Sequence, residues 1–223
     1  MNIQDNTVSA EKQVQKSRYT EIFNNGGKVN ILFVGNSITR HEPKPEIGWN
    51  NDWGMAASSK ENDYVHIAVR MLAEKLGKVN YCIANCGEWE CRYFDDELIC
   101  EWEKAKNFPA DIVVIRLGEN IVQAKDGLSL EPLAPHYLKM VQYFASSPSV
   151  KVITTGLFWR QETIERAILQ VAQEQGYAFV PLSDLGEDEK NMAIGEFEHR
   201  GVAMHPNDRG MQKIAERIVA AAL

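Results

Sequence analysis

Five hydrophobic runs recur along the chain, and each is followed by a segment in which apolar residues have helical spacing. The runs span 29–34, 79–84, 111–117, 151–157 and 178–182. They are nearly continuous in apolar residues and show little of the polar alternation found in a strand with one face in water. Such strands alternating with helices are typical of a parallel sheet covered on both faces. The pattern therefore predicts an α/β domain, a three-layer α/β/α sandwich around a five-stranded parallel sheet.

Helices are expected between these strands. Ser58 and Glu61 have the spacing of a capping box, which predicts a helix beginning there and ending at Gly77. The other helices are expected within 93–106, around 135–146, from about 164 to Gly176, and from near Asn207 onwards.

A polar segment precedes the first strand. Residues 8–24 have the pattern of a polar helix that ends at Gly26-Gly27, a common C-cap. We therefore expect a helical N-terminal extension over 1–28 and a single domain over 29–223. A domain of this size buries roughly 70–75% of its unfolded surface, so its core needs no disulfide or metal.

Composition narrows the set of partners. The formal net charge is −7, from 24 Lys+Arg against 31 Asp+Glu, and the sequence contains no basic run. This charge argues against nucleic acid or an anionic membrane as the main partner. The polar N-terminus lacks the apolar core of a signal peptide, and the four cysteines form no CxxC pair. We expect a reduced, cytoplasmic protein without a membrane span.

Candidate chemistry follows the strands. In open parallel sheets ligands bind beyond the carboxyl ends of the strands. A serine, a histidine and several amides occur at such positions, and these are the parts that acyl transfer needs: a nucleophile, a base and oxyanion donors. Alone, each is also an ordinary turn or cap residue. The segments are Gly35-Asn36-Ser37, Asn85-Cys86-Gly87, Gly118-Glu119-Asn120 and His205-Pro206-Asn207.

The segments that contain Ser37, Asn120 and His205 resemble sequence blocks of the SGNH (GDSL-like) hydrolase superfamily, in the same order and at similar spacing. The resemblance runs from about residue 29 to the C-terminus. It implies a flavodoxin-like sheet and hydrolysis of esters or thioesters through an acyl-serine. Ser37 is then the nucleophile and His205 the general base. The Ser37 amide and the Asn120 side chain are then oxyanion donors.

The chain departs from the family pattern at the oxyanion hole. Asn36 stands where the family more often has aspartate, and Ile121 follows Asn120 where an aspartate is usual. The second block normally ends in a glycine whose amide is the third oxyanion donor. That place falls on Glu90, while Gly87 is the glycine nearby. The third donor is therefore Gly87 or Glu90.

The largest departure concerns the base. The family normally has an aspartate three residues before the histidine, and here that residue is Val202. A general-base imidazole needs its Nδ1 proton held, so another acceptor must replace the acid. A backbone carbonyl near Val202 is the economical choice, and it predicts a Ser37–His205 dyad oriented by main chain. The alternative acceptors are carboxylates: Glu196, Glu198 or Asp184.

A long loop follows the serine and holds candidate substrate contacts. Tryptophan faces beside polar donors suit a ring-shaped polar ligand such as a sugar, although the same side chains could equally cover the edge of the sheet. Three nearby glutamates, Glu88, Glu90 and Glu119, would disfavour an anionic substrate. The candidate substrate-binding residues are Arg40, His41, Trp49 and Trp53.

The residues together favour a metal-independent serine esterase that removes small acyl groups, such as acetyl, from a small-molecule, carbohydrate-like alcohol. Two alternatives stay open: a lysophospholipase or thioesterase, and a non-catalytic carbohydrate-binding domain. No cofactor is expected, because the sequence has no GxGxxG and no P-loop, and its cysteines lack zinc-site spacing. GxSxG is absent, which disfavours the α/β-hydrolase fold. Cys86 is expected to be a buried structural residue.

Overall fold

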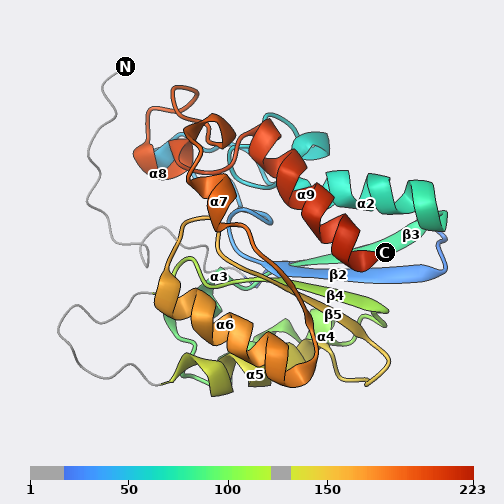
Figure 1. Cartoon of the computed structure of the whole chain (residues 1–223). Helices are drawn as coiled ribbons and strands as arrows, with labels where there is room; N and C mark the ends of the chain where they lie inside the picture. The colour runs from blue at the N-terminus through green and yellow to red at the C-terminus, as the bar shows by residue number, and fades with distance from the viewer. Residues whose placement is uncertain (1–17, 122–131) are drawn as a thin grey trace.

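A computed structural model of the chain describes residues 18–121 and 132–223. Within these residues a six-stranded sheet has the order β1-β3-β2-β4-β5-β6. All neighbouring strands are parallel except β1, which runs antiparallel to β3. Helices cover both faces of the sheet (Figure 1). The strands are β1 (Thr20–Phe23), β2 (Val29–Gly35), β3 (Val79–Asn85), β4 (Ile112–Arg116), β5 (Lys151–Thr155) and β6 (Ala178–Val180).

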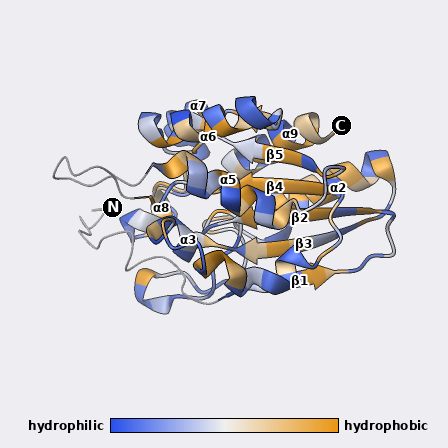
Figure 2. Ribbon diagram, turned by 90° about the horizontal axis from the view of Figure 1, so that it is seen from below, coloured by the Kyte–Doolittle hydropathy of each residue, from blue (hydrophilic) through white to orange (hydrophobic). Residues whose placement is uncertain are grey.

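The predicted three-layer sandwich is confirmed. The five predicted strands are β2 to β6, and their order along the sheet is that of the flavodoxin-like doubly wound folds. In such a sheet the chain reverses its direction of winding beside the first parallel strand, here β2. Figure 2 shows mostly hydrophobic residues along the strands and a mixture of hydrophilic and hydrophobic residues on the helices.

The predicted N-terminal helix is wrong for residues 20–23. Thr20–Phe23 forms β1 instead of the end of a helix, so the described part of the chain has six strands rather than five. The rest of the expected helix, 8–17, lies outside the described residues. None of the four residues of β1 is fully buried, and they pair with 81–84, about 60 residues away. A short, half-exposed edge strand leaves no hydrophobic run in the sequence.

Two long helices lie on each face of the sheet. α2 (Tyr64–Leu76) and α9 (Asp208–Ala222) cover one face, and α5 (Leu133–Phe144) and α6 (Glu162–Gln175) cover the other (Figure 1). None of the helices within 18–121 and 132–223 is long and apolar enough to cross a membrane. The short helices are α3 (Gly87–Cys91), α4 (Glu103–Lys106), α7 (Ser183–Gly186) and α8 (Arg200–Ala203). Single 3₁₀ turns span Pro45–Ile47, Lys60–Asn62, Leu98–Trp102 and Glu189–Asn191.

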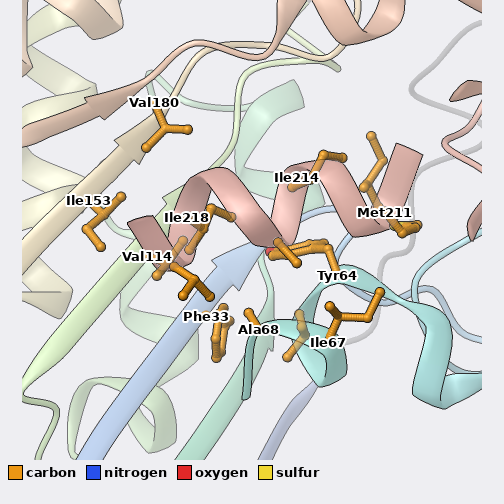
Figure 3. Packing of buried hydrophobic residues seen from close by; sticks show 14 of the residues in the cluster. Phe33, Tyr64, Ile67, Ala68, Val114, Ile153, Val180, Met211, Ile214 and Ile218 are labelled. Atoms are coloured by element: carbon orange, nitrogen blue, oxygen red, sulfur yellow. The ribbon is translucent and has the colours of Figure 1, made fainter. Parts of the chain in front are cut away.

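The side chains of each strand alternate between two hydrophobic cores. Ile31 and Phe33 of β2 face α2 and α9, whereas Leu32 and Val34 face α5 and α6. Figure 3 shows Phe33 packed among residues of α2, α9 and the neighbouring strands. These four side chains are fully buried, and each such burial contributes about 1.5–3 kcal/mol. The core therefore fixes β2 in the centre of the sheet, directly before the loop that carries Ser37, which we call the serine loop.

The helix termini differ from prediction at two places. α2 begins after Asp63, whose side chain accepts the His66 N–H, so the predicted capping box at Ser58 is wrong. Ser58 instead donates to Asp208. The helix expected within 93–106 is divided into the 3₁₀ turn Leu98–Trp102 and α4, and α3 forms earlier, directly after β3. The predicted ends at Gly77 and Gly176 and the start after Asn207 are confirmed.

Candidate active site

Three neighbouring strands end at one edge of the sheet, and the residues that follow them line one cavity. Gly35 at the end of β2 pairs with Asn85 of β3 and with Arg116 of β4. The segments after these strands therefore emerge side by side. Their residues meet those of α8 and of the α8–α9 connection around a cavity of about 350 Å³. The cavity is lined by Ser37, His41, Ile47, Met55, Asn85, Gly87, Glu119, Asn120, Trp159, Arg200, Gly201, Met204 and His205.

A tight turn after β2 presents Ser37 to this cavity. The backbone N–H groups of Thr39 and Arg40 donate to the Asn36 carbonyl at 2.9 and 3.0 Å. The turn needs glycine at residue 35, because a Cβ there would collide with the Thr39 side chain. Within the described chain the Ser37 N–H has no partner, which leaves it available to an oxyanion.

His205 lies directly against the serine. Its Nε2 is 2.8 Å from Ser37 Oγ, and its Nδ1 is 2.6 Å from the carbonyl oxygen of Gly201. A carbonyl can only accept, so Nδ1 carries the proton and Nε2 accepts from the serine hydroxyl. Burial lowers the pKa of His205 to about 3, although the bond to Gly201 acts in the opposite direction. The imidazole is therefore neutral at neutral pH.

The carboxylates that the sequence suggests as partners of His205 do not contact it. Asp184 makes two 2.6 Å hydrogen bonds to Arg217, and Glu196 and Glu198 are exposed. Among the described residues, the Gly201 carbonyl is the partner of His205 Nδ1. Val202 itself is fully buried, in an apolar cluster with Trp49.

Besides Ser37, two of the expected oxyanion donors border the cavity. Gly87 and Asn120 are part of its lining, whereas Glu90 is not among the described residues that line it. The Gly87 N–H donates to Asn85 Oδ1 at 2.9 Å. Asn120 Nδ2 donates to Glu90 Oε2 at 2.5 Å, so Glu90 contributes a carboxylate beside the site instead of a backbone amide at its surface.

A buried polar network lies beneath the serine loop. Asn36 Nδ2 donates to Glu90 Oε1 at 3.0 Å and to Glu119 Oε2 at 2.7 Å. Arg116 donates to Asn36 Oδ1, and to Glu119 Oε1 at 2.5 Å. The Gly118 N–H donates to Glu90 Oε1 at 2.5 Å. Burial raises the pKa of Glu90 to about 7, and the neighbouring Glu119 carboxylate acts in the same direction.

Of the four candidate substrate contacts, His41 lines the cavity. The structure does not support direct contact by the other three, which are outside the described lining. Trp49 is fully buried and its Nε1 donates to the His41 carbonyl, while Trp53 Nε1 donates to the Ala57 carbonyl. The Arg40 guanidinium stacks over the Tyr19 ring. The two tryptophans pack in one cluster with Ile47 and Met55, which line the cavity.

Several lining residues were not anticipated from the sequence. Trp159 follows β5 and packs edge-on against His205, with ring centroids 5.0 Å apart. The same strand-end rule that selected the other segments would have found it. Arg200 and Met204 come from α8 and the residue after it, and Ile47 and Met55 from the long loop, where no motif points to them.

The charge around the cavity also differs from expectation. Glu88 is ion-paired with Arg18 and Arg92, and Glu119 is bonded to Arg116. Arg200 is a cationic side chain in the lining. The expected bias against anionic substrates therefore has little basis in the structure.

The other candidate chemistries gain no support. Burial raises the pKa of the Cys86 thiol well above its ordinary value, which makes it a poor nucleophile. Within the described ranges, no group of three His, Cys, Asp or Glu side chains could hold a metal ion.

The chain has the fold of the SGNH hydrolases. No family model and no curated protein matches the sequence, but solved structures match the fold. A protein from Bacteroides uniformis described as a GDSL-like lipase has a TM-score of 0.56 at 14% identity, covering 87% of this chain and 95% of that one. One from Parabacteroides merdae with the same description has a TM-score of 0.55 at 16% identity, covering 87% and 97%.

A carbohydrate esterase family 2 enzyme with a carbohydrate-binding domain, from Corynascus thermopiles (Myceliophthora fergusii), has a TM-score of 0.54 at 16% identity. The match covers 87% of this chain and 65% of that one. GDSL-like lipases and these carbohydrate esterases are hydrolases of the SGNH superfamily. At such identities the likeness establishes the fold, and the chemistry must be argued from the site.

Proposed function

We propose that this protein is a serine esterase that hydrolyses small acyl esters, such as acetyl esters, of a carbohydrate-like alcohol. The observation that carries the proposal is the contact between Ser37 Oγ and His205 Nε2, at 2.8 Å on the wall of a cavity. A hydroxyl that shares its proton with a neutral, oriented imidazole is the arrangement that activates serine as a nucleophile.

The reaction follows from the positions of these groups. Ser37 Oγ attacks the acyl carbon and its proton passes to His205 Nε2, while Nδ1 keeps its proton on the Gly201 carbonyl. The tetrahedral oxyanion forms beside the Ser37 N–H and the Asn120 amide. The imidazolium then gives its proton to the leaving alcohol, and an acyl-serine remains. Water repeats the sequence and releases the carboxylic acid and free Ser37.

The size and lining of the cavity favour a small ester. A volume of about 350 Å³ lies at the lower end of the range for small-molecule sites. Trp159 presents an apolar ring beside His205, and the lining also contains the polar residues His41, Asn85 and Arg200. The shared fold with family 2 carbohydrate esterases supports a sugar as that alcohol.

One observation favours a second candidate, an acylhydrolase for longer chains. Ile47, Met55 and Met204 give the cavity an apolar wall, and two structures with this fold are described as GDSL-like lipases. Rates on nitrophenyl esters of increasing chain length separate the two: a maximum at acetate supports the first candidate, and a maximum at a long acyl chain supports the second.

The test of the catalytic proposal is labelling of the nucleophile. A fluorophosphonate probe should modify Ser37, and rapid quenching with an acetyl ester should trap an acetyl group on the same peptide by mass spectrometry. Ser37→Ala should abolish labelling and turnover while the protein stays folded, because Ser37 lies in a loop beyond the core. Retained turnover in Ser37→Ala would refute Ser37 as the nucleophile. A wild type that shows neither labelling nor turnover would refute the esterase proposal and favour a binding domain.

A further inference from the structure

Glu90 and Asn36 depart from the family pattern, and the structure brings them into contact. Asn36 Nδ2 donates to Glu90 Oε1 at 3.0 Å, although 53 residues separate them in the sequence. Glu90 is 1% exposed and lies on α3, the short helix that follows β3. The two unusual residues thus form one contact, directly under the segment that carries Ser37.

We propose that Glu90 is a positioning residue, whose carboxylate holds the Asn120 amide in the orientation that donates to the oxyanion. We further propose that Asn36 is required in place of an aspartate because Glu90 is present. Both statements rest on the proposed esterase function, since they assign Asn120 to the oxyanion hole.

The first argument is the hydrogen-bond capacity of Asn120. Above its pKa of about 7 the Glu90 carboxylate is ionised and only accepts, so the Asn120 amide can then face it only through its nitrogen. Asn120 Nδ2 donates one N–H to Glu90 Oε2 at 2.5 Å, which fixes the direction of the amide. The second N–H stays available on a residue that lines the cavity. Without the carboxylate, the amide could turn over and present its oxygen to the developing negative charge.

The second argument is the hydrogen-bond capacity of Asn36. Its two N–H groups go to Glu90 and Glu119, and its oxygen accepts from Arg116 and from the Ile38 N–H. An aspartate has no N–H to give, and it would place a third carboxylate beside a single guanidinium. The asparagine therefore bridges two acids that would otherwise repel each other.

The Glu90 carboxylate receives three donors from two segments of the site. Asn36 precedes the serine, Gly118 follows β4, and Asn120 is the expected oxyanion donor. Glu90 thus connects the loop of the nucleophile with the loop of the oxyanion donor. A glycine at this position, as in the family pattern, could not make this connection.

The decisive variant is Glu90→Gln. Glutamine keeps the size but has one oxygen and one NH₂. With its oxygen toward Asn36 and Gly118, its NH₂ faces the Asn120 NH₂, and Asn120 must turn its amide over to relieve the clash. We expect kcat to fall by about 10²–10³, as for loss of one oxyanion donor, with KM changed much less.

A double-mutant cycle separates this role from a purely structural one. In an Asn120→Ala background the amide is gone, so Glu90→Gln should cause no further loss of kcat. Glu88→Gln, two residues away on α3 and outside the cavity lining, is the matched control and should leave kcat unchanged. Thermal unfolding of every variant shows whether a lost rate reflects lost fold.

A charge exchange tests the part played by Asn36. Asn36→Asp should lower kcat strongly, because three carboxylates then share Arg116. Adding Glu90→Gln restores the original number of carboxylates. In this background the glutamine can turn its NH₂ toward the new aspartate and keep its oxygen on Asn120, so at least tenfold of that loss should be recovered. If Glu90→Gln alone does not fold, Glu90→Asp takes its place in the cycle with Asn120→Ala, since it keeps the charge but withdraws it from the amide.

Two results would overturn the inference. One is a wild-type kcat in folded Glu90→Gln or Glu90→Asp. The other is a double variant of Glu90 and Asn120 whose loss of kcat equals the product of the losses in the two single variants. Neither result touches the nucleophile: failure of the esterase proposal would appear as turnover in Ser37→Ala. The two failures are therefore distinguishable.

Discussion

Removing each carboxylate that the sequence offered as a partner of His205 should leave ester hydrolysis intact. The variants are Asp184→Asn, Glu196→Gln and Glu198→Gln. In the structure His205 Nδ1 is bonded to the Gly201 carbonyl at 2.6 Å, and a side-chain substitution elsewhere does not remove that acceptor.

The expected magnitudes follow from the contacts of these acids. Loss of a true triad acid, with the wrong imidazole tautomer, costs about 10⁴ in kcat. Because the carbonyl remains, we expect kcat within about twofold of wild type for all three variants. Asp184 does bond Arg217, but this pair is largely exposed, so its removal should cost only about 0.2–1 kcal/mol of stability.

The assay is steady-state hydrolysis of a chromogenic acetate, with thermal unfolding measured on the same preparations. His205→Ala serves as the reference for complete loss of the base. A fall in kcat greater than about 10³ in any one folded carboxylate variant would identify a triad acid and refute the dyad oriented by main chain.

Four further predictions follow from the site and the residues around it. Asn120→Ala should lower kcat by roughly 10²–10³ with a smaller change in KM; a raised KM with kcat unchanged would make it a substrate contact instead. The ring protons of His205 should not titrate by NMR between pH 5 and 8, because burial lowers its pKa to about 3; a midpoint near 6.5 would contradict this. Below pH 6.5 the unfolded state binds more protons than the folded state at His205, so the free energy of unfolding should decrease as the pH falls from 6.5 toward 3. The raised pKa of Glu90 has the opposite effect and should increase the free energy of unfolding as the pH falls from about 7 to 4.5. Trp49→Ala should cost about 3–5 kcal/mol in denaturant unfolding, because the ring is fully buried; a near-wild-type stability with a raised KM would restore it as a sugar contact.

The strands and the place of the site could be predicted because both depend on local pattern. Continuous apolar runs identify strands buried on two faces, and parallel strands bring their carboxyl ends to one edge. That rule selects Ser37, Gly87 and Asn120, and all three line one cavity in the structure. Applied to β5 as well, it would have included Trp159.

The remaining features depend on contacts between distant residues. β1 is defined by its pairing with β3, and its own residues are too exposed to show a hydrophobic run. Trp49 has the aromatic side chain that often contacts sugars, but it packs against Val202, which is more than 150 residues away in the sequence. Alignment of Glu90 with a family glycine suggests a role for its backbone amide, whereas in the structure its side chain makes the contact with Asn120. The spacing of residues does not reveal the direction of a side chain.

The hydrogen bond from His205 to Gly201 has a consequence for how such proteins are recognised and how they evolve. A triad acid is specified by one codon, so its loss is visible in an alignment and invites classification as a pseudoenzyme. The Gly201 carbonyl in the first turn of α8 is specified by the conformation of the backbone, and many residues at position 201 could present it. Point mutation therefore cannot easily delete this acceptor. Surveys that infer inactivity from a missing acid should consider the backbone four residues before the histidine.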